Sequence, residues 1–473
     1  MSDQSAKRLS PLFRWLVLAI MSLICFAQYF IYDSITPLGP LISKELGFSD
    51  SQYGLLFSFY AVANICGLLL IAGVLVDKLG LKVSGIAYGF LCVLGAAITA
   101  VGAWKGLPDF LGGGYGWLRT AFFPDWSPEL KVMLLGRMIY GLGAESILVV
   151  NNKVLARWFT GRELAFSYGL NLTIMRLGTF LALSLQEPVA EWVGMRHSLW
   201  IATAVMATGF ATFFVYLALE AMARGRPGAP AAAVGAAGSE EKFVLKDAFS
   251  FSASFWFITL LCVTFYSAVF PFQSFAPKIL VQKFGYTEKW AGFITSALIV
   301  GTMICTPVFG WFVDHRGKRA TMMLFGALLL IPCHLLIAFT GLPPVIPIFL
   351  VGVALSLVPA ALWAAIPMMV PESRLGTAFG VVGYVQNVGL ALFPWLAGMI
   401  SDAHISKVVV DGKPVDFVDY RWTLVMFAAL GIFGFIFALL LKRSDAANGS
   451  PLEKPRLAEA APVSPTPAAT ANT

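Results

Sequence analysis

The amino-acid sequence predicts an all-α membrane protein with twelve membrane-spanning helices. Hydrophobic residues make up 58% of the 473 residues and charged residues only 12%, whereas soluble domains carry about 25% charged residues. The mean hydropathy is +0.78. Apolar runs recur along the chain, and each is near or above the roughly 20 residues that a helix needs to cross a bilayer. These three observations indicate a polytopic membrane protein.

Twelve spans can be drawn, and several contain Gly and Pro, which transmembrane helices tolerate. They cover residues 13–37, 51–76, 83–104, 131–157, 163–186, 197–219, 251–279, 288–313, 319–341, 345–370, 376–400 and 421–441. An Ala/Gly/Pro-rich segment, 224–242, follows the sixth span and predicts a flexible linker. We therefore expect an N-terminal six-helix bundle (1–222), a cytoplasmic linker (223–248), a C-terminal six-helix bundle (249–443) and a disordered cytoplasmic tail (444–473).

Lysine and arginine are more frequent in the segments that share a side with both termini, which predicts cytoplasmic termini. The net charge of +7 is spread over short loops, so it reflects membrane topology and not nucleic-acid binding. The short loops and Ala-rich tail favour a bacterial inner membrane. The six cysteines all lie in apolar runs and form no metal-ligand pattern. No nucleotide-binding or hydrolase motif occurs, so we expect neither an enzyme nor a cofactor or metal.

Two apolar spans, 131–157 and 163–186, carry opposite charges at matched depth. Glu145 precedes Thr160, in the predicted turn 160–162, by 15 residues, and Arg176 follows it by 16 residues. At about 1.5 Å per residue, both charges lie roughly 22–24 Å from the turn, near the bilayer midplane. Ionisable groups at that depth are energetically expensive and are usually functional.

These charges suit a small zwitterionic substrate, because Glu145 can accept an ammonium group and Arg176 can bind a carboxylate with its fork of donors. The C-terminal half carries no Asp, Glu, Lys or Arg at mid-depth and offers polar and aromatic groups in their place. The predicted substrate-binding residues are Glu145, Arg176, Tyr29, Tyr32, Trp363, Gln386, Asn387 and Tyr266. The alternative is that Glu145 and Arg176 neutralise each other across adjacent helices.

Asp33 and Asn152 are candidates for a path or coupling role. Tyr29, Tyr32 and Asp33 share one helix face, so Asp33 could serve as a gate, a proton site or a hydrated helix end. Asn152 follows Glu145 by seven residues and lies on its helix face, which places it on an inner path.

A loop motif occurs twice, at residues 73–82 after the second span and at 310–319 after the eighth. In each copy, an Asp at the helix end can pair with basic neighbours, and a Gly permits a tight connection between two helices. This repeat, the twelve spans and the central linker resemble the major facilitator superfamily, and residues 137–143 resemble its second motif. The resemblance implies two bundles that rock about a substrate site at their interface. It implies a conformational role for Asp77, Lys78, Gly80, Asp314, Arg316, Gly317 and Arg137.

A narrower resemblance covers nearly the whole chain. It rests on residues 29–33, 143–146, 151–152, 157–159, 175–176, 269–272, 361–363, 370–372 and 386–390. These segments are similar to the branch that contains the animal lysosomal dipeptide transporters. That branch implies a uniporter in the lipid bilayer that moves dipeptides by facilitated diffusion.

Two alternatives stay open at this point. One is an importer of organic anions or other metabolites, or a proton-coupled symporter. The first span lacks the ExxER pattern that is typical of proton-coupled oligopeptide carriers. The other alternative is of a different class, a sensor built on a transporter scaffold without net flux.

Overall fold

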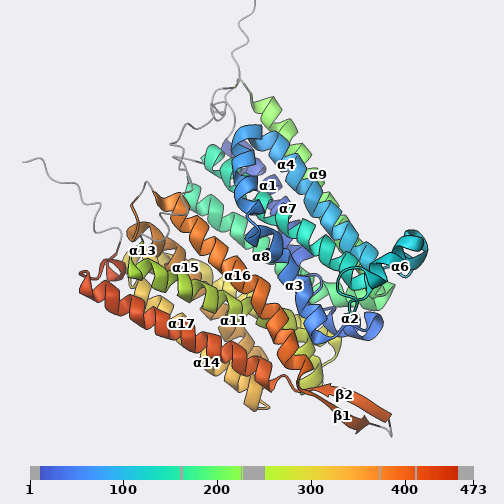
Figure 1. Ribbon diagram of the computed structural model, residues 1–473. Helices are drawn as coiled ribbons and strands as arrows, with labels where there is room; N and C mark the ends of the chain where they lie inside the picture. The colour runs from blue at the N-terminus through green and yellow to red at the C-terminus, as the bar shows by residue number, and fades with distance from the viewer. Residues whose placement is uncertain are drawn as a thin grey trace, which may run out of the picture.

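The computed structural model describes residues 11–159, 163–224, 226, 251–371, 374–410 and 413–455. The predicted turn at 160–162, Glu372, most of the linker and the tail from residue 456 onward lie outside these residues. Within them, ten helices are long and apolar enough to cross a membrane. The remaining two predicted spans are also helical, as described below. The prediction of twelve transmembrane helices in two bundles is confirmed (Figure 1).

The N-terminal bundle contains six of the predicted spans. Its helices are α1 (Pro11–Asp33), α2 (Gly39–Leu46), α3 (Asp50–Ile65), α4 (Leu68–Gly102), α5 (Leu107–Leu111), α6 (Gly113–Thr120), α7 (Pro128–Phe159), α8 (Leu164–Val193) and α9 (Met195–Ala223). The second span is broken: it begins as α3 and continues into the start of α4. Helix α4 also contains the third span, and Gly80 separates the two parts with φ 78° and ψ 165°, which glycine adopts readily.

The C-terminal bundle holds the other six spans. Its elements are α11 (Ala253–Phe284), α12 (Glu288–Thr295), α13 (Ala297–Arg316), α14 (Arg319–Phe339), α15 (Val345–Ala365), η1 (Ile366–Met368), α16 (Leu375–Asp402), β1 (Ile405–Val410), β2 (Lys413–Val418), α17 (Arg421–Ala447) and η3 (Pro451–Glu453). The antiparallel hairpin β1–β2 pairs Ile405 with Val418 and was not predicted. We call the end of the molecule with α2 and this hairpin the hairpin end, and the opposite end, where α9 finishes, the linker end (Figure 1).

The predicted disorder of the tail is wrong for residues 444–455. Helix α17 continues to Ala447, and η3 then packs against the start of α14. The Glu453 carboxylate accepts hydrogen bonds from the backbone N–H and hydroxyl of Thr321, at 2.9 and 2.8 Å. The Arg319 guanidinium donates to the Lys454 carbonyl at 2.9 Å. Polar composition suggested disorder, but these polar groups instead satisfy free donors in the first turn of a helix.

The two bundles approach most closely where α3 packs against α16. A Cβ atom at Gly54 would lie 2.2 Å from the Pro394 carbonyl oxygen, and one at Gly398 would lie 2.1 Å from the Asp50 carbonyl oxygen. Only glycine permits such a close approach between the two backbones. The Asp402 carboxylate accepts hydrogen bonds from the Asp50 and Ser51 N–H groups at the start of α3, at 2.8 and 2.9 Å.

A buried ion pair joins the bundles nearby. Lys278 of α11 pairs with Asp50 and donates to the Ser43 hydroxyl at 2.7 Å. The Tyr53 hydroxyl donates to the Ser274 carbonyl at 2.9 Å. The bundles are therefore held together at the hairpin end by close packing, hydrogen bonds and charge.

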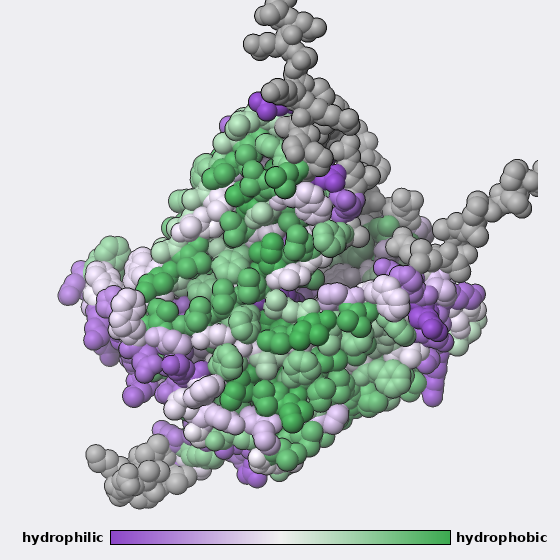
Figure 2. All heavy atoms as spheres, turned by 180° about the vertical axis from the view of Figure 1, so that it is seen from behind, coloured by the Kyte–Doolittle hydropathy of each residue, from purple (hydrophilic) through white to green (hydrophobic). Residues whose placement is uncertain are grey.

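The outer surface matches a lipid environment. Figure 2 shows hydrophobic residues across the middle of the molecule and hydrophilic residues gathered toward its two ends. Large apolar side chains such as Phe325 and Phe433 are more than half exposed on this kind of surface. Such extensive apolar exposure is typical of a face that contacts acyl chains.

Candidate functional site

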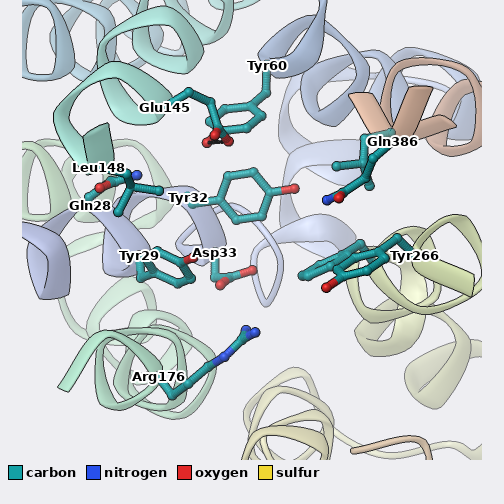
Figure 3. A pocket seen from close by; sticks show the side chains of 12 residues that line it. Gln28, Tyr29, Tyr32, Asp33, Tyr60, Glu145, Leu148, Arg176, Tyr266 and Gln386 are labelled. Carbon is teal, nitrogen blue, oxygen red and sulfur yellow. Dashed lines mark hydrogen bonds between the residues drawn. The ribbon is translucent and has the colours of Figure 1, made fainter. Parts of the chain in front are cut away.

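A cavity of about 230 Å³ lies between the two bundles. Helices α1, α3, α7 and α8 form its N-terminal wall, and α11 and α16 form its C-terminal wall. Its lining comprises Gln28, Tyr29, Tyr32, Asp33, Tyr60, Glu145, Leu148, Arg176, Tyr266, Phe270, Gln386 and Leu390. Six of the eight residues predicted to bind substrate thus meet around one space (Figure 3).

Glu145 points into one end of this cavity from α7 (Figure 3). The Tyr60 hydroxyl on α3 donates to Glu145 Oε1 at 2.8 Å. Gln28 fixes the adjacent backbone by donating to the Ala144 carbonyl at 3.0 Å. Among the described ion pairs, none involves Glu145. The Tyr60 hydroxyl therefore holds this carboxylate, and no described cation pairs with it.

Arg176 points into the opposite end from α8, with Tyr32 and Asp33 between it and Glu145 (Figure 3). Its guanidinium carbon lies 5.7 Å from the centroid of the Tyr29 ring, a cation–π contact. Its buried Nε has no hydrogen-bond partner within the described part of the chain. The two charges do not pair with each other in this structure, so the mutual-neutralisation alternative is not the arrangement seen here.

Asp33 connects the cavity to the other bundle. It ends α1, and its Oδ1 accepts a hydrogen bond from Gln273 Nε2 on α11 at 2.7 Å. The residue is only 3% exposed and lines the cavity. Any group that competes with Gln273 for this carboxylate would weaken a contact between the bundles.

The C-terminal wall differs from the prediction in two residues. Tyr266 and Gln386 line the cavity, but Trp363 and Asn387 do not. Trp363 donates from Nε1 to the Tyr266 hydroxyl at 3.1 Å. The Asn387 amide donates to the Gly383 carbonyl at 2.9 Å, and its oxygen accepts from Asn64 at 3.4 Å. Both residues therefore support the wall without facing the cavity.

Asn152 is exposed on α7 and also lies outside this cavity. Its carbonyl accepts a hydrogen bond from the Tyr168 hydroxyl at 3.0 Å. A helix face shared with Glu145 did not bring the asparagine to the same space, because seven residues separate the two by nearly two helical turns along the axis.

Five lining residues were missed: Gln28, Tyr60, Leu148, Phe270 and Leu390. Four of them carried a usable signal, because each lies three or four positions from a predicted residue on the same helix. Tyr60 carried none: it is on α3, and no predicted site residue belongs to that helix.

The residues of the repeated loop motif lie apart from the cavity. Lys78, Asp314 and Arg316 are exposed, whereas the side chain of Asp77 lies outside the described residues. Gly317, with φ 71°, is buried against the tail, and a Cβ there would lie 2.4 Å from the Lys454 carbonyl oxygen. The docked segment 451–455 thus packs against the Gly317 end of the second copy, while Asp314 and Arg316 stay exposed.

Arg137 is in the core of the N-terminal bundle and not in a loop. It is 2% exposed, and its Nε donates to the Leu56 carbonyl at 2.8 Å. Its guanidinium carbon lies 5.3 Å from the Tyr32 ring and 5.8 Å from the Tyr60 ring. Arg137 therefore packs behind two tyrosines that line the cavity. Across the described residues, no group of three or more His, Cys, Asp or Glu side chains could hold a metal ion.

Two six-helix bundles that enclose a central cavity lined by charged side chains define a multi-pass membrane transporter. The sequence profile of the Major Facilitator Superfamily matches residues 18–292 and 272–471. The chain belongs to this superfamily.

Similar proteins agree with this assignment. The chain is 29% identical over 396 residues to the lysosomal dipeptide transporter MFSD1 of Homo sapiens, covering 82% of this chain and 80% of that protein. It is also 29% identical over 403 residues to the MFSD1 of Danio rerio, covering 83% and 81%. A crystal structure of a bacterial homolog of the human lysosomal transporter Spinster, inward-facing and occupied, superimposes with a TM-score of 0.67 at 16% identity, covering 93% of this chain and 99% of that one. That likeness concerns the fold alone.

Proposed function

We propose that this transporter carries dipeptides across the membrane by alternating access, as a uniporter. The observation that carries the proposal is that Glu145 and Arg176 enter one cavity from opposite ends without pairing. An unpaired charge inside a membrane protein is expensive unless a ligand or a solvent-filled space compensates it. A dipeptide offers one ammonium and one carboxylate, separated by a backbone of at most about 7 Å.

In this proposal each end of the substrate has its own receptor. Glu145 binds the ammonium group, with Tyr60 orienting the carboxylate. Arg176 binds the substrate carboxylate, with Tyr29 supporting the guanidinium. Tyr266 and Gln386 close the cavity from the second bundle and contact the peptide unit or side chains. Groups of this kind impose little selection on side chains, which suits a broad range of dipeptides.

The conformational cycle is proposed to involve the loop motifs and the contacts at the hairpin end. Those contacts include the Lys278–Asp50 pair and the Asp33–Gln273 hydrogen bond. They hold the hairpin end closed here, so transport requires that they open. We place the protein in a bacterial inner membrane with its linker end in the cytoplasm, because basic residues favour that side.

Counterflow uptake in proteoliposomes tests the function. Vesicles loaded with an unlabelled dipeptide should take up a labelled one, and other dipeptides should compete more strongly than free amino acids or monocarboxylates. Competition by monocarboxylates as strong as that by dipeptides would favour an organic-anion importer that uses Arg176 alone. Absence of any flux, with binding retained, would favour a sensor.

A second candidate is proton-coupled symport, favoured by Asp33. This carboxyl group lines the cavity and bonds to the opposite bundle, and ionisable groups inside membranes often act as proton sites. An imposed proton gradient distinguishes the two mechanisms. A uniporter only equalises the dipeptide concentrations on the two sides of the membrane. A symporter driven by the proton gradient raises the dipeptide concentration inside the vesicles above the concentration outside.

A further inference from the structure

A second cavity, of about 410 Å³, lies between α8 and α13. It is formed by the first half of α8 and the middle of α13, and the α8 residues place it toward the linker end. Its lining is mainly apolar, and Arg176 belongs to the lining of both this cavity and the central one. We call it the α8–α13 cavity.

The few hydroxyl groups on its wall are already used by their own helices. Thr173 donates to the Gly169 carbonyl at 3.0 Å, Thr302 to the Leu298 carbonyl at 3.0 Å, and Thr306 to the Thr302 carbonyl at 2.7 Å. Thr302 and Thr306 also lie within hydrogen-bond distance of the Gly352 carbonyl and the Ser356 hydroxyl on α15, at 3.4 and 3.1 Å. All three hydroxyl groups thus already have acceptors within the protein. Apart from Arg176, a ligand in this cavity would contact mostly hydrocarbon groups. Its occupant is therefore an apolar group that is attached to an anionic group bound by Arg176.

We propose that the α8–α13 cavity receives the side chain of the C-terminal residue of the dipeptide and selects large apolar side chains there. This inference rests on the proposed function. If Arg176 binds the substrate carboxylate, the Cα that carries the C-terminal side chain is about 1.5 Å from the carboxylate carbon. That side chain therefore starts at the junction of the two cavities.

The N-terminal side chain has different surroundings. It starts beside the ammonium group at Glu145, where Tyr60 and Gln28 present polar atoms. A dipeptide bound in this direction places its two side chains in chemically distinct sites. The structure therefore assigns a directional preference: Gly-Phe binds more tightly than Phe-Gly.

Competition between isomeric dipeptides in counterflow tests the inference. In the wild-type protein, Gly-Phe and Gly-Leu should compete at least about tenfold more strongly than Phe-Gly and Leu-Gly. A ratio of this size is expected when several carbon atoms of a ligand are buried in an apolar pocket. Thr173→Phe fills the cavity from α8 and should lower the ratio of Gly-Phe to Gly-Gly competition by at least about tenfold.

The matched control is Thr208→Phe on α9. Thr208 is also exposed and bonds its own helix, at 2.9 Å to the Ala204 carbonyl, and its substitution should leave that ratio unchanged.

The results of these competition experiments distinguish a failure of the side-chain site from a failure of the proposed dipeptide transport. If no dipeptide competes in the wild-type protein, the proposed function fails and the side-chain site fails with it. If dipeptides compete but the isomers are equal in the wild type, the side-chain site alone is overturned, whatever the variants do. A Thr173→Phe protein that melts normally but weakens all dipeptides alike also overturns it, since a lipid acyl chain in the cavity would give that result.

Discussion

At the scale of single residues, the two charges proposed to bind substrate differ from ordinary ion-paired charges in what surrounds them. Glu145 is held by a tyrosine hydroxyl and Arg176 by a tyrosine ring, and neither belongs to an ion pair among the described residues. Tyr60 and Tyr29 fix the two side chains at opposite ends of the cavity (Figure 3). This arrangement keeps both charges available to a ligand that carries the two complementary charges.

Glu145→Gln should abolish most dipeptide transport while preserving the fold. The amide oxygen of glutamine can still accept the Tyr60 hydrogen bond, but the charge that attracts an ammonium is lost. A charge-assisted hydrogen bond contributes about 1.5–3 kcal/mol, so dipeptide affinity should fall about 10- to 100-fold. Counterflow measures the loss, and the melting temperature without ligand serves as the control. Unchanged dipeptide affinity would remove Glu145 from the site.

Arg176→Lys should lower the affinity for the substrate carboxylate even though the positive charge is kept. Lysine has no planar fork of donors and cannot bind a carboxylate at two points. We expect affinity to fall about tenfold in Arg176→Lys and further in Arg176→Ala. Equal transport by wild type, Arg176→Lys and Arg176→Ala would show that the substrate carboxylate binds elsewhere.

At the scale of the elements, the contact of α3 with α16 and α11 holds the hairpin end together. Among the described residues, the buried Lys278–Asp50 pair is the only ion pair that joins the two bundles. Removing one member leaves the other charge buried and uncompensated, which costs about 3–5 kcal/mol. The cycle must nevertheless separate these groups, so the pair sets how easily the hairpin end opens.

Lys278→Met should therefore shift the protein toward a state that is open at the hairpin end. A cysteine introduced at Ser274, which is 4% exposed, in a protein without its native cysteines should react with maleimide faster in the Lys278→Met background. The double variant Asp50→Asn/Lys278→Met removes both charges and should restore slow labelling. Equal labelling rates in all three proteins would exclude the pair as a lock.

The docked tail should stabilise the C-terminal bundle. Glu453→Ala removes the acceptor for the Thr321 N–H and hydroxyl, and loss of a comparable helix cap costs about 1 kcal/mol. The melting temperature should fall, while Glu453→Gln, which retains an acceptor oxygen, should lose less. No change in either variant would mean that the segment 451–455 contributes nothing to stability.

Much of the fold was predictable because its signals are local in sequence. Each span shows its own hydropathy, and Glu145 and Arg176 stand out as ions in apolar runs. The Tyr60–Glu145 and Glu453–Thr321 contacts join segments far apart in the chain, so no local pattern predicts them. Trp363 and Asn387 were placed on the correct wall, but whether a side chain faces the cavity depends on the rotation of the packed helix.

At the scale of the whole molecule, one cavity is shared by two bundles of unequal charge. The N-terminal bundle supplies Glu145, Arg176 and Asp33, and the C-terminal bundle supplies aromatic, amide and apolar groups to the same lining. A substrate held by charge on one side and by neutral contacts on the other can stay with the first bundle while the second moves. Rocking about the N-terminal bundle is thus the motion that this distribution favours.

The central claim is that the cavity binds both the ammonium and the carboxylate of a dipeptide. Thermal stabilisation by ligands tests this claim most directly. Ligands that bind the folded state raise the melting temperature by mass action. Ala-Ala should raise the melting temperature of the purified protein, whereas N-acetyl-Ala-Ala, without the ammonium, and Ala-Ala-amide, without the carboxylate, should raise it far less. Equal stabilisation by the free and the blocked dipeptides would contradict the account.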